Sequence, residues 1–147
     1  MENEKTYVTL QEYNEYHDRI FNDLPWNEKE WKTVSERLEM EKKLNEMYKH
    51  LMPEVGMGAT EILWSDRRAK TVVEVINPNK IVVRENEVVC KDYYAGDYEI
   101  LDELSKMPSE IFTRRKSGRW VEMGQPDKYG SVYLILGYRA HYIDPSF

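Results

Sequence analysis

The hydrophobic pattern of this chain changes its period near Gly56. Before that residue, apolar side chains recur at three- and four-residue intervals, which is the spacing of one face of an α-helix. After it, short apolar segments alternate with turn residues, which is typical of β-strands. The change predicts an α+β fold, with a helical segment at 1–53 followed by a β-rich core at 54–147.

The first segment carries signals for two helices, one short and one long. Thr9 and Glu12 form a capping-box pattern, and Pro25 is expected to end the helix that they begin. Asn27 and Glu30 start a second, longer helix in the same way. The long helix has an apolar stripe, which must be buried on its own domain or on another subunit. We therefore expect this segment to anchor the chain in a homodimer or larger homo-oligomer.

The second segment contains many short strand-like stretches. One further stretch, 101–107, is compatible with a short helical turn. Short strands at close spacing favour a small antiparallel barrel or sandwich. The predicted strands are 59–65, 70–76, 80–84, 87–91, 93–100, 109–115, 120–123 and 132–138.

Composition limits the classes of function. Hydrophobic residues make up 41% of the chain, which indicates a globular protein. The net charge of -6 argues against binding long nucleic acid, where neutralising phosphates dominates affinity. Cys90 is the single cysteine, so no intrachain disulfide is possible and a reducing, cytoplasmic location is expected. No apolar run suggests a membrane span, and the three histidines are too scattered to predict a metal site.

Arginines and aromatic residues are interleaved in the last third of the chain. The run Phe112-Thr-Arg-Arg-Lys-Ser-Gly-Arg-Trp120 is followed later by Leu136-Gly-Tyr-Arg139. Guanidinium groups bind phosphate bidentately and flat rings stack on bases, so the mixture suits a small anionic ligand with an aromatic part. Side chains alternate along a strand, so only one of Arg114 and Arg115 can line a pocket with Arg139.

These residues also have ordinary structural interpretations. The arginines would serve equally well in salt bridges on solvated strand faces, and the tyrosines around Gly96 in core or edge packing. Gly56-Met-Gly58 lacks the pattern of a phosphate loop and is better interpreted as a turn. Asp66 and Asp144 have no visible catalytic partner, so an enzyme is the weakest hypothesis. Neither a catalytic residue nor a cofactor is predicted.

Several short motifs together resemble a known family. They are Gly58-Ala-Thr60, Ser65-Asp66-Arg67, Thr71-Val-Val-Glu-Val75, the arginine–aromatic run, Gly137-Tyr-Arg139 and Asp144-Pro-Ser-Phe147. In this pattern the chain resembles the Thoeris anti-defence sponges of phages and prophages, which sequester cyclic ADP-ribose signals. The resemblance covers the chain from residue 54 onward.

The resemblance implies a β core with an N-terminal anchoring helix, assembled into a homo-oligomer. It implies binding of a cyclic ADP-ribose isomer without cleavage in the cytoplasm of the host bacterium, and in some relatives cyclic oligonucleotides at separate sites. Arg115 and Arg139 would match the family's ligand-binding arginines. We expect these two arginines to pair with the pyrophosphate and either Phe112 or Tyr94 to stack on adenine. The predicted ligand-binding set is Arg139, Arg115, Phe112, Arg119, Tyr94 and Arg67.

The acidic helical segment supports a rival hypothesis. Its charge could mimic nucleic acid, which suits an inhibitor that binds a host defence nuclease or effector directly. This hypothesis predicts activity that survives Arg139→Ala but is lost on deleting residues 1–53. A small nucleotide-processing enzyme that uses Asp66 or Asp144 as a base is the third hypothesis.

Overall fold

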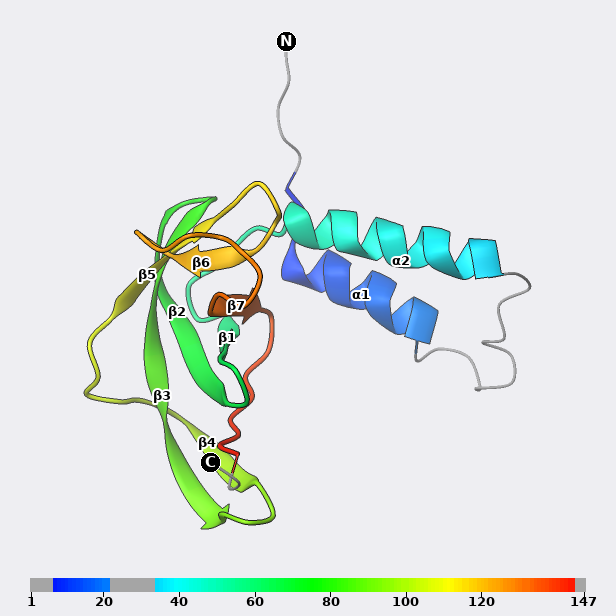
Figure 1. Ribbon diagram of the computed structural model, residues 1–147. Coiled ribbons are helices and arrows are strands. Elements are labelled where there is room, and N and C mark those ends of the chain that lie inside the picture. Colours follow the sequence, from blue (N-terminus) through cyan, green and yellow to red (C-terminus); the bar gives the residue numbers. More distant parts are fainter. Residues whose placement is uncertain (1–6, 22–33, 145–147) are drawn as a thin grey trace. The chain divides into compact units, whose positions relative to one another are not determined.

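The computed structural model describes residues 7–21 and 34–144. The chain divides into two compact units, Met1–Met52 and Pro53–Phe147. The order of helices and strands confirms the predicted α+β fold, with helices followed by an antiparallel barrel (Figure 1). Within the described ranges, no helix is both long and apolar enough to cross a membrane.

The helical unit contains α1 (Leu10–Phe21) and α2 (Val34–Lys49). The predicted capping box is present, since Glu12 N donates to Thr9 Oγ1 at 3.1 Å and Thr9 N donates to Glu12 Oε1 at 3.2 Å. Tyr13 packs on Tyr48 of the other helix, with ring centroids 6.0 Å apart. The predicted break at Pro25 and the predicted helix start at 27–30 lie outside the described residues.

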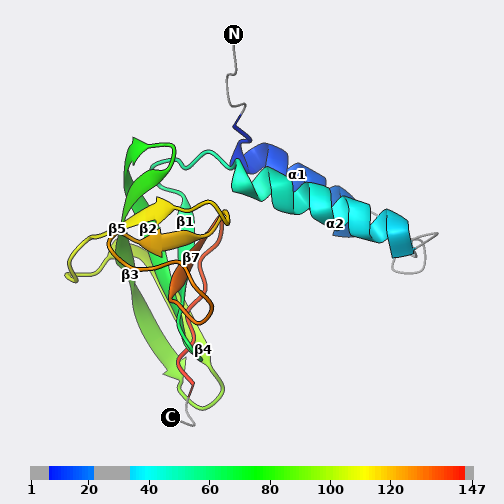
Figure 2. The same cartoon turned by 45° about the horizontal axis from the view of Figure 1, so that its top comes forward.

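Six strands of the second unit close into an antiparallel barrel (Figures 1 and 2). They follow the order β2-β1-β7-β6-β5-β3, and β3 pairs back onto β2. Closure pairs both edges of every strand in the ring, which leaves the ring itself no free sheet edge. The strands of this unit are β1 (Gly58–Ile62), β2 (Arg67–Asn77), β3 (Lys80–Asp92), β4 (Asp97–Leu104), β5 (Glu110–Arg114), β6 (Trp120–Glu122) and β7 (Tyr133–Leu136).

Large apolar side chains fill the barrel from alternate positions of its strands. Phe112 pairs in register with Ile81, and these residues are 1% and 0% exposed. Trp120 pairs with Leu134 across β6 and β7, at 0% and 1% exposed. The period-2 alternation of a strand therefore places the largest side chains of the unit in its core.

Strands β3 and β4 continue beyond the barrel as a hairpin, which we call the arm (Figure 1). The two strands predicted at 80–84 and 87–91 are one continuous strand, because its first half pairs in the barrel and its second half pairs with β4. The suggested helical turn at 101–107 is wrong, since β4 runs on to Leu104, which pairs with Asn86. Gly96, with φ of 70°, lies in the turn of the arm.

The segment after β7 crosses the outside of β1 and β2. Gly137 N donates to Gly58 O at 2.8 Å, and Thr60 Oγ1 donates to Tyr138 O at 2.8 Å. Further on, Arg67 and Tyr142 exchange two backbone hydrogen bonds. Figures 1 and 2 both show this segment, in red, running from β7 toward β4. Residues 137–144 are thus fixed to the barrel wall.

Candidate functional site

The arginine–aromatic run folds into β5, a turn and β6. Arg114, the last residue of β5, lies over the Trp120 ring, with its guanidinium carbon 4.8 Å from the ring centroid. Its Nη2 donates to Pro78 O at 2.6 Å and its Nε donates to Asn79 Oδ1 at 3.1 Å. Arg114 therefore ties this hairpin to the turn between β2 and β3.

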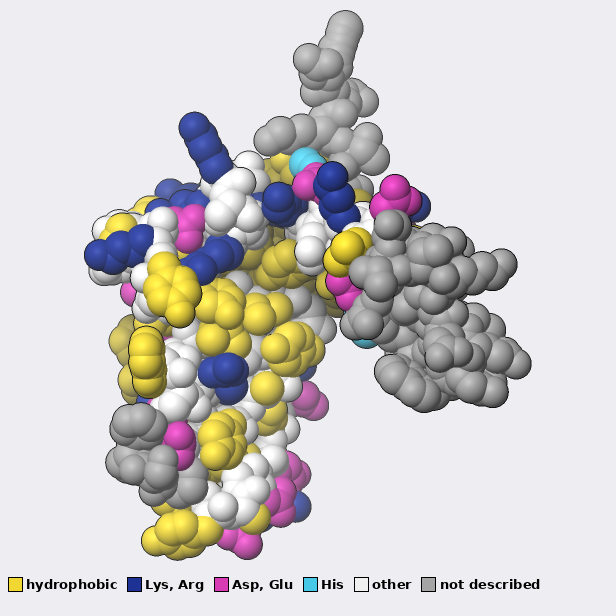
Figure 3. Space-filling model, turned by 45° about the vertical axis from the view of Figure 1, so that its right-hand side comes forward, with side chains coloured by type: hydrophobic (Ala, Val, Ile, Leu, Met, Phe, Trp, Pro, Cys, Tyr) yellow, Lys and Arg dark blue, Asp and Glu magenta, His cyan; other side chains and the backbone are white. Residues whose placement is uncertain are grey.

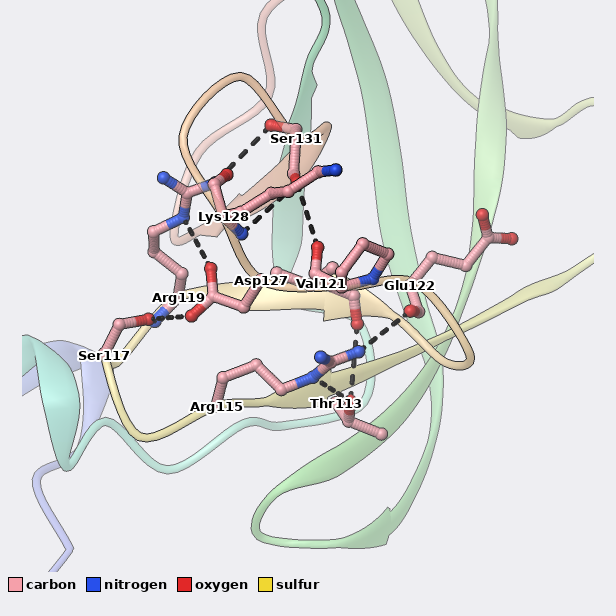
Figure 4. Close-up of polar contacts among 10 residues, drawn as sticks. Thr113, Arg115, Ser117, Arg119, Val121, Glu122, Asp127, Lys128 and Ser131 are labelled. Atoms are coloured by element: carbon pink, nitrogen blue, oxygen red, sulfur yellow. Dashed lines mark hydrogen bonds and ion pairs between the residues drawn. The ribbon is translucent and has the colours of Figure 1, made fainter.

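Arg115 is bound to its own hairpin instead (Figure 4). Its Nε donates to Thr113 Oγ1 at 2.8 Å, and its Nη2 donates to the carbonyl of Glu122 at 3.0 Å. Neighbouring arginines thus contact different parts of the barrel, as the alternation of side chains along a strand requires. The contacts of Arg115 are structural links across the β5–β6 hairpin.

Arg119 fixes the loop between β6 and β7. Its guanidinium lies 4.4 Å from the centroid of the Tyr133 ring, and its Nε is 3.4 Å from Asp127 Oδ1. Ser117 donates to the other oxygen of the same carboxylate at 2.5 Å. Figure 4 shows these side chains joining the β5–β6 turn to the loop. Three of the arginines in the run therefore hold together one end of the barrel.

Arg67 closes the turn between β1 and β2. Its Nη1 donates to Leu63 O at 3.3 Å and to Asp66 O at 2.9 Å. Both acceptors are backbone carbonyls of the turn that Arg67 itself follows. The side chain therefore has a local role in shaping the chain reversal.

Arg139 lies against the outer face of β2, where it is partly buried. Its Nε donates to Thr71 Oγ1 at 3.0 Å and its Nη2 donates to Gly56 O at 3.2 Å. Thr71 in turn donates to Asn86 Oδ1 at 2.8 Å. A Cβ on Gly58 would come within 2.9 Å of Arg139 Cγ, so glycine is what lets the arginine lie this close.

The two predicted stacking residues lie in very different surroundings. Phe112 is 1% exposed in the barrel core, so its ring is not presented to a surface ligand. Tyr94 lies in the turn at the tip of the arm, 83% exposed, with its ring 5.3 Å from that of Tyr93. Tyr138, which precedes Arg139, is 49% exposed and was not among the predicted residues.

The predicted site residues are not gathered in one place. Arg114 N bonds Asn79 O at the start of β3, whereas Thr71, the partner of Arg139, pairs with Arg84 further along it. Tyr94 follows the far end of β3, and a strand of this length spans roughly 40 Å. Figure 3 shows basic side chains gathered at the upper end of the β unit, with acidic ones toward the lower end. Arg139 is thus separate from the arginine hairpin, whereas the segment that carries it continues along the arm, where His141 contacts Tyr98 and Tyr142 lies beside Gly96.

Sequence reasoning missed a group of charged side chains inside the barrel. They occupy inward positions of β1, β2, β3 and β5, where apolar residues were expected. The signal in the sequence was a charged residue in register with the apolar, inward positions of the same strand, as with Lys70 and Val72 or Glu110 and Phe112. Nothing in the sequence alone joins them, because their strands are far apart along the chain. The group is Glu61, Arg68, Lys70, Glu85 and Glu110.

The interior charges alter one another's ionisation. Burial raises the pKa of Glu61, and the charge of Lys70 only partly offsets this. For Lys70, burial acts to lower the pKa, but the hydrogen bond to Glu110 and the nearby carboxylates outweigh it and raise the pKa. Burial and the charge of Arg68 lower the pKa of His141, which contacts Tyr98 with ring centroids 4.8 Å apart.

No protein-family model, curated protein or solved structure matches this chain.

Proposed function

We propose that the β unit binds a small anionic nucleotide at Arg139 and holds it without cleaving it, with a cyclic ADP-ribose isomer as the ligand. The observation that carries the proposal is the state of this guanidinium. Two of its nitrogens are engaged by Thr71 and Gly56. A guanidinium has five N–H donors, so these two bonds fix the group and leave the other donors for a ligand.

Fixing the guanidinium in advance favours tight binding. A flexible arginine loses side-chain entropy when it binds an anion, whereas Arg139 is already held by two hydrogen bonds. Charge-assisted hydrogen bonds to a pyrophosphate contribute about 1.5–3 kcal/mol each. Tyr138 adds an exposed ring next to the guanidinium in sequence, which suits an adenine.

The deciding experiment is calorimetric titration of the full chain with cyclic ADP-ribose isomers, followed by heat release and chromatography of the ligand. We expect binding with the nucleotide recovered unchanged. Arg139→Ala should weaken binding at least about 100-fold, equal to about 2.7 kcal/mol. Arg139→Lys keeps the charge but loses the bidentate geometry, so its nucleotide affinity should lie between that of the natural chain and that of Arg139→Ala.

The sponge proposal is wrong if Arg139→Ala binds as tightly as the natural chain. A ligand recovered in altered form would instead identify an enzyme. The assembly that the proposal includes, a homodimer or larger homo-oligomer in the host bacterial cytoplasm, is measured separately by light scattering during size-exclusion chromatography.

One observation favours direct inhibition of a host protein as the second candidate. On α2, Leu38 is 58% exposed and Met40 is 37% exposed, and the acidic residues Glu39 and Glu41 alternate with them. Exposed apolar side chains set among acidic ones suit a basic protein partner. Activity in infected cells that survives Arg139→Ala but is lost in Leu38→Gln/Met40→Gln would favour this function.

A further inference from the structure

The charged side chains inside the barrel line a cavity of about 320 Å³. Its walls come from inward positions that are paired in register, Glu61 with Arg68 and Lys70 with Glu85. Met107 and Pro108, from the segment between β4 and β5, complete the lining. The volume is at the lower end of the range for small-molecule sites, so only a small ligand fits.

The deeper part of the cavity has an excess of negative charge. Lys70 has a side chain that is only 5% exposed, and its Nζ lies 2.6 Å from Glu110, 3.3 Å from Glu85 and 3.5 Å from Glu61. An ammonium group has three donors, and three carboxylates surround this one. Each carboxylate accepts about four hydrogen bonds, so these groups keep acceptor sites that Lys70 cannot fill.

The outer part of the cavity is positive. The Arg68 side chain is 38% exposed, and its Nη1 lies 3.7 Å from Glu85 Oε2, which is too long for a hydrogen bond. The charge of Arg68 also acts on Glu61 and His141, but among the described residues its guanidinium donates no hydrogen bond. Arg68 therefore keeps its donors for a ligand at the rim, beside the exposed Met107.

We propose that this cavity binds a small zwitterion, with its ammonium group directed inward to the carboxylates and its anionic group at Arg68. The choice of a zwitterion follows from the positions of the charges, with Arg68 at the rim and the carboxylates further in. A simple anion would have to pass Arg68 and meet three carboxylates, whereas a simple cation would leave the guanidinium with only its long ion pair to Glu85. Buried charges are costly unless each is paired, so a ligand that carries both signs matches the cavity better than either alone.

This site is independent of the nucleotide site at Arg139. Thr71, which holds Arg139, and Lys70 are successive residues of β2, so their side chains lie on opposite faces of the barrel wall. Replacing Arg68 should therefore change zwitterion binding and leave nucleotide binding as it was. The two proposals can fail separately.

The test uses three probes of matched length on the full chain: 4-aminobutanoate, butylamine and butanoate. Calorimetry at equal pH and ionic strength should give an affinity for 4-aminobutanoate at least about tenfold above that for either single-charge probe, equal to about 1.4 kcal/mol. Arg68→Gln should remove that advantage without weakening butylamine binding, because the lost guanidinium repels an ammonium group. Lys91→Gln, which removes a positive charge from the arm, is the matched control and should bind as the natural chain does.

A second variant distinguishes a loss of ligand binding from a loss of folding. Glu110→Gln keeps the shape of a side chain that is 28% exposed and removes one inward charge. It should weaken both 4-aminobutanoate and butylamine while the near-ultraviolet circular dichroism stays unchanged. The proposal is overturned if none of the three probes binds. Equal affinity for butylamine and 4-aminobutanoate, or an unchanged preference in Arg68→Gln, would overturn it too.

Discussion

The arginine hairpin, β5 and β6 with their turn, and the segment carrying Arg139 use the same side chain in different ways. In the hairpin, Arg114, Arg115 and Arg119 bind carbonyls, rings and a carboxylate of the same chain. Arg139 is held by Thr71 and Gly56, which use only part of its donors. The comparison teaches that a dense cluster of arginines in a sequence can be a structural device, whereas an isolated arginine is better placed for a ligand. Arg115 and Arg139 each make two hydrogen bonds, so what separates them is where the guanidinium lies, across its own hairpin or on the outer face of β2.

The largest effect on stability is expected at Arg114. Arg114→Ala removes two hydrogen bonds to the β2–β3 turn and the contact with Trp120, so the free energy of unfolding should fall by about 2 kcal/mol. Urea unfolding measures this loss. The exposed Lys116→Ala is the control, with a change within about 0.5 kcal/mol. A loss equal to that of the control would mean that the hairpin arginines are not structural, and the comparison would fail.

The next largest effect is expected on nucleotide binding at Arg139. In Gly58→Ala the new Cβ would lie 2.9 Å from Arg139 Cγ and 3.4 Å from the Tyr138 carbonyl carbon, so the guanidinium must shift. Nucleotide affinity should fall about tenfold, equal to about 1.4 kcal/mol. The same substitution should have no further effect in an Arg139→Ala background, because the group that it displaces is gone. Additive losses in the double variant would show that Gly58 acts independently of Arg139.

A smaller, local effect is expected at Arg119. Arg119→Ala removes the contacts of Arg119 with Asp127 and Tyr133, which hold the loop at 125–131. The free energy of unfolding should fall by about 1 kcal/mol. Hydrogen exchange of the loop amides should accelerate while that of β1 and β2 stays the same. Nucleotide affinity should stay within threefold of the natural chain, to within about 0.6 kcal/mol. An affinity loss as large as that of Arg139→Ala would show that the arginine hairpin takes part in nucleotide binding.

The fold could be predicted where one signal dominated. The change of period near Gly56 and the capping box at Thr9 depend on neighbouring residues, and the structure has both features. The break predicted within β3 failed because Arg84-Glu-Asn-Glu87 is polar. Those residues lie where the strand leaves the barrel for the arm, so they need no apolar alternation. Pairing partners far along the chain decided the outcome there.

The candidate site was harder to predict, because it depends on which side chains are already engaged. Phe112 belongs to a motif that suits stacking, yet its register with Ile81 directs it into the core. Thr71 belonged to a family motif but was given no role at the site, since only the fold brings residue 139 back to it. The interior pair of Lys70 and Glu110 joins strands 40 positions apart, and no local pattern encodes such a contact.

The smallest effect extends the comparison to the barrel interior, where Lys70 faces the carboxylates of Glu61, Glu85 and Glu110. Burial raises the pKa of Glu61 in the folded chain, so its contribution to stability is full below its ordinary pKa and is lost as pH rises through the folded pKa. Glu61→Gln cannot ionise. Its stability relative to the natural chain should therefore rise between pH 4 and pH 8, ending within about 1 kcal/mol of it or above it. Urea unfolding across this pH range measures the trend.

A variant that loses stability relative to the natural chain as pH rises would show that ionised Glu61 supports the fold. Charge inside the barrel would then be used as in the arginine hairpin, for structure, and the excess of negative charge around Lys70 would no longer distinguish the cavity as a ligand site.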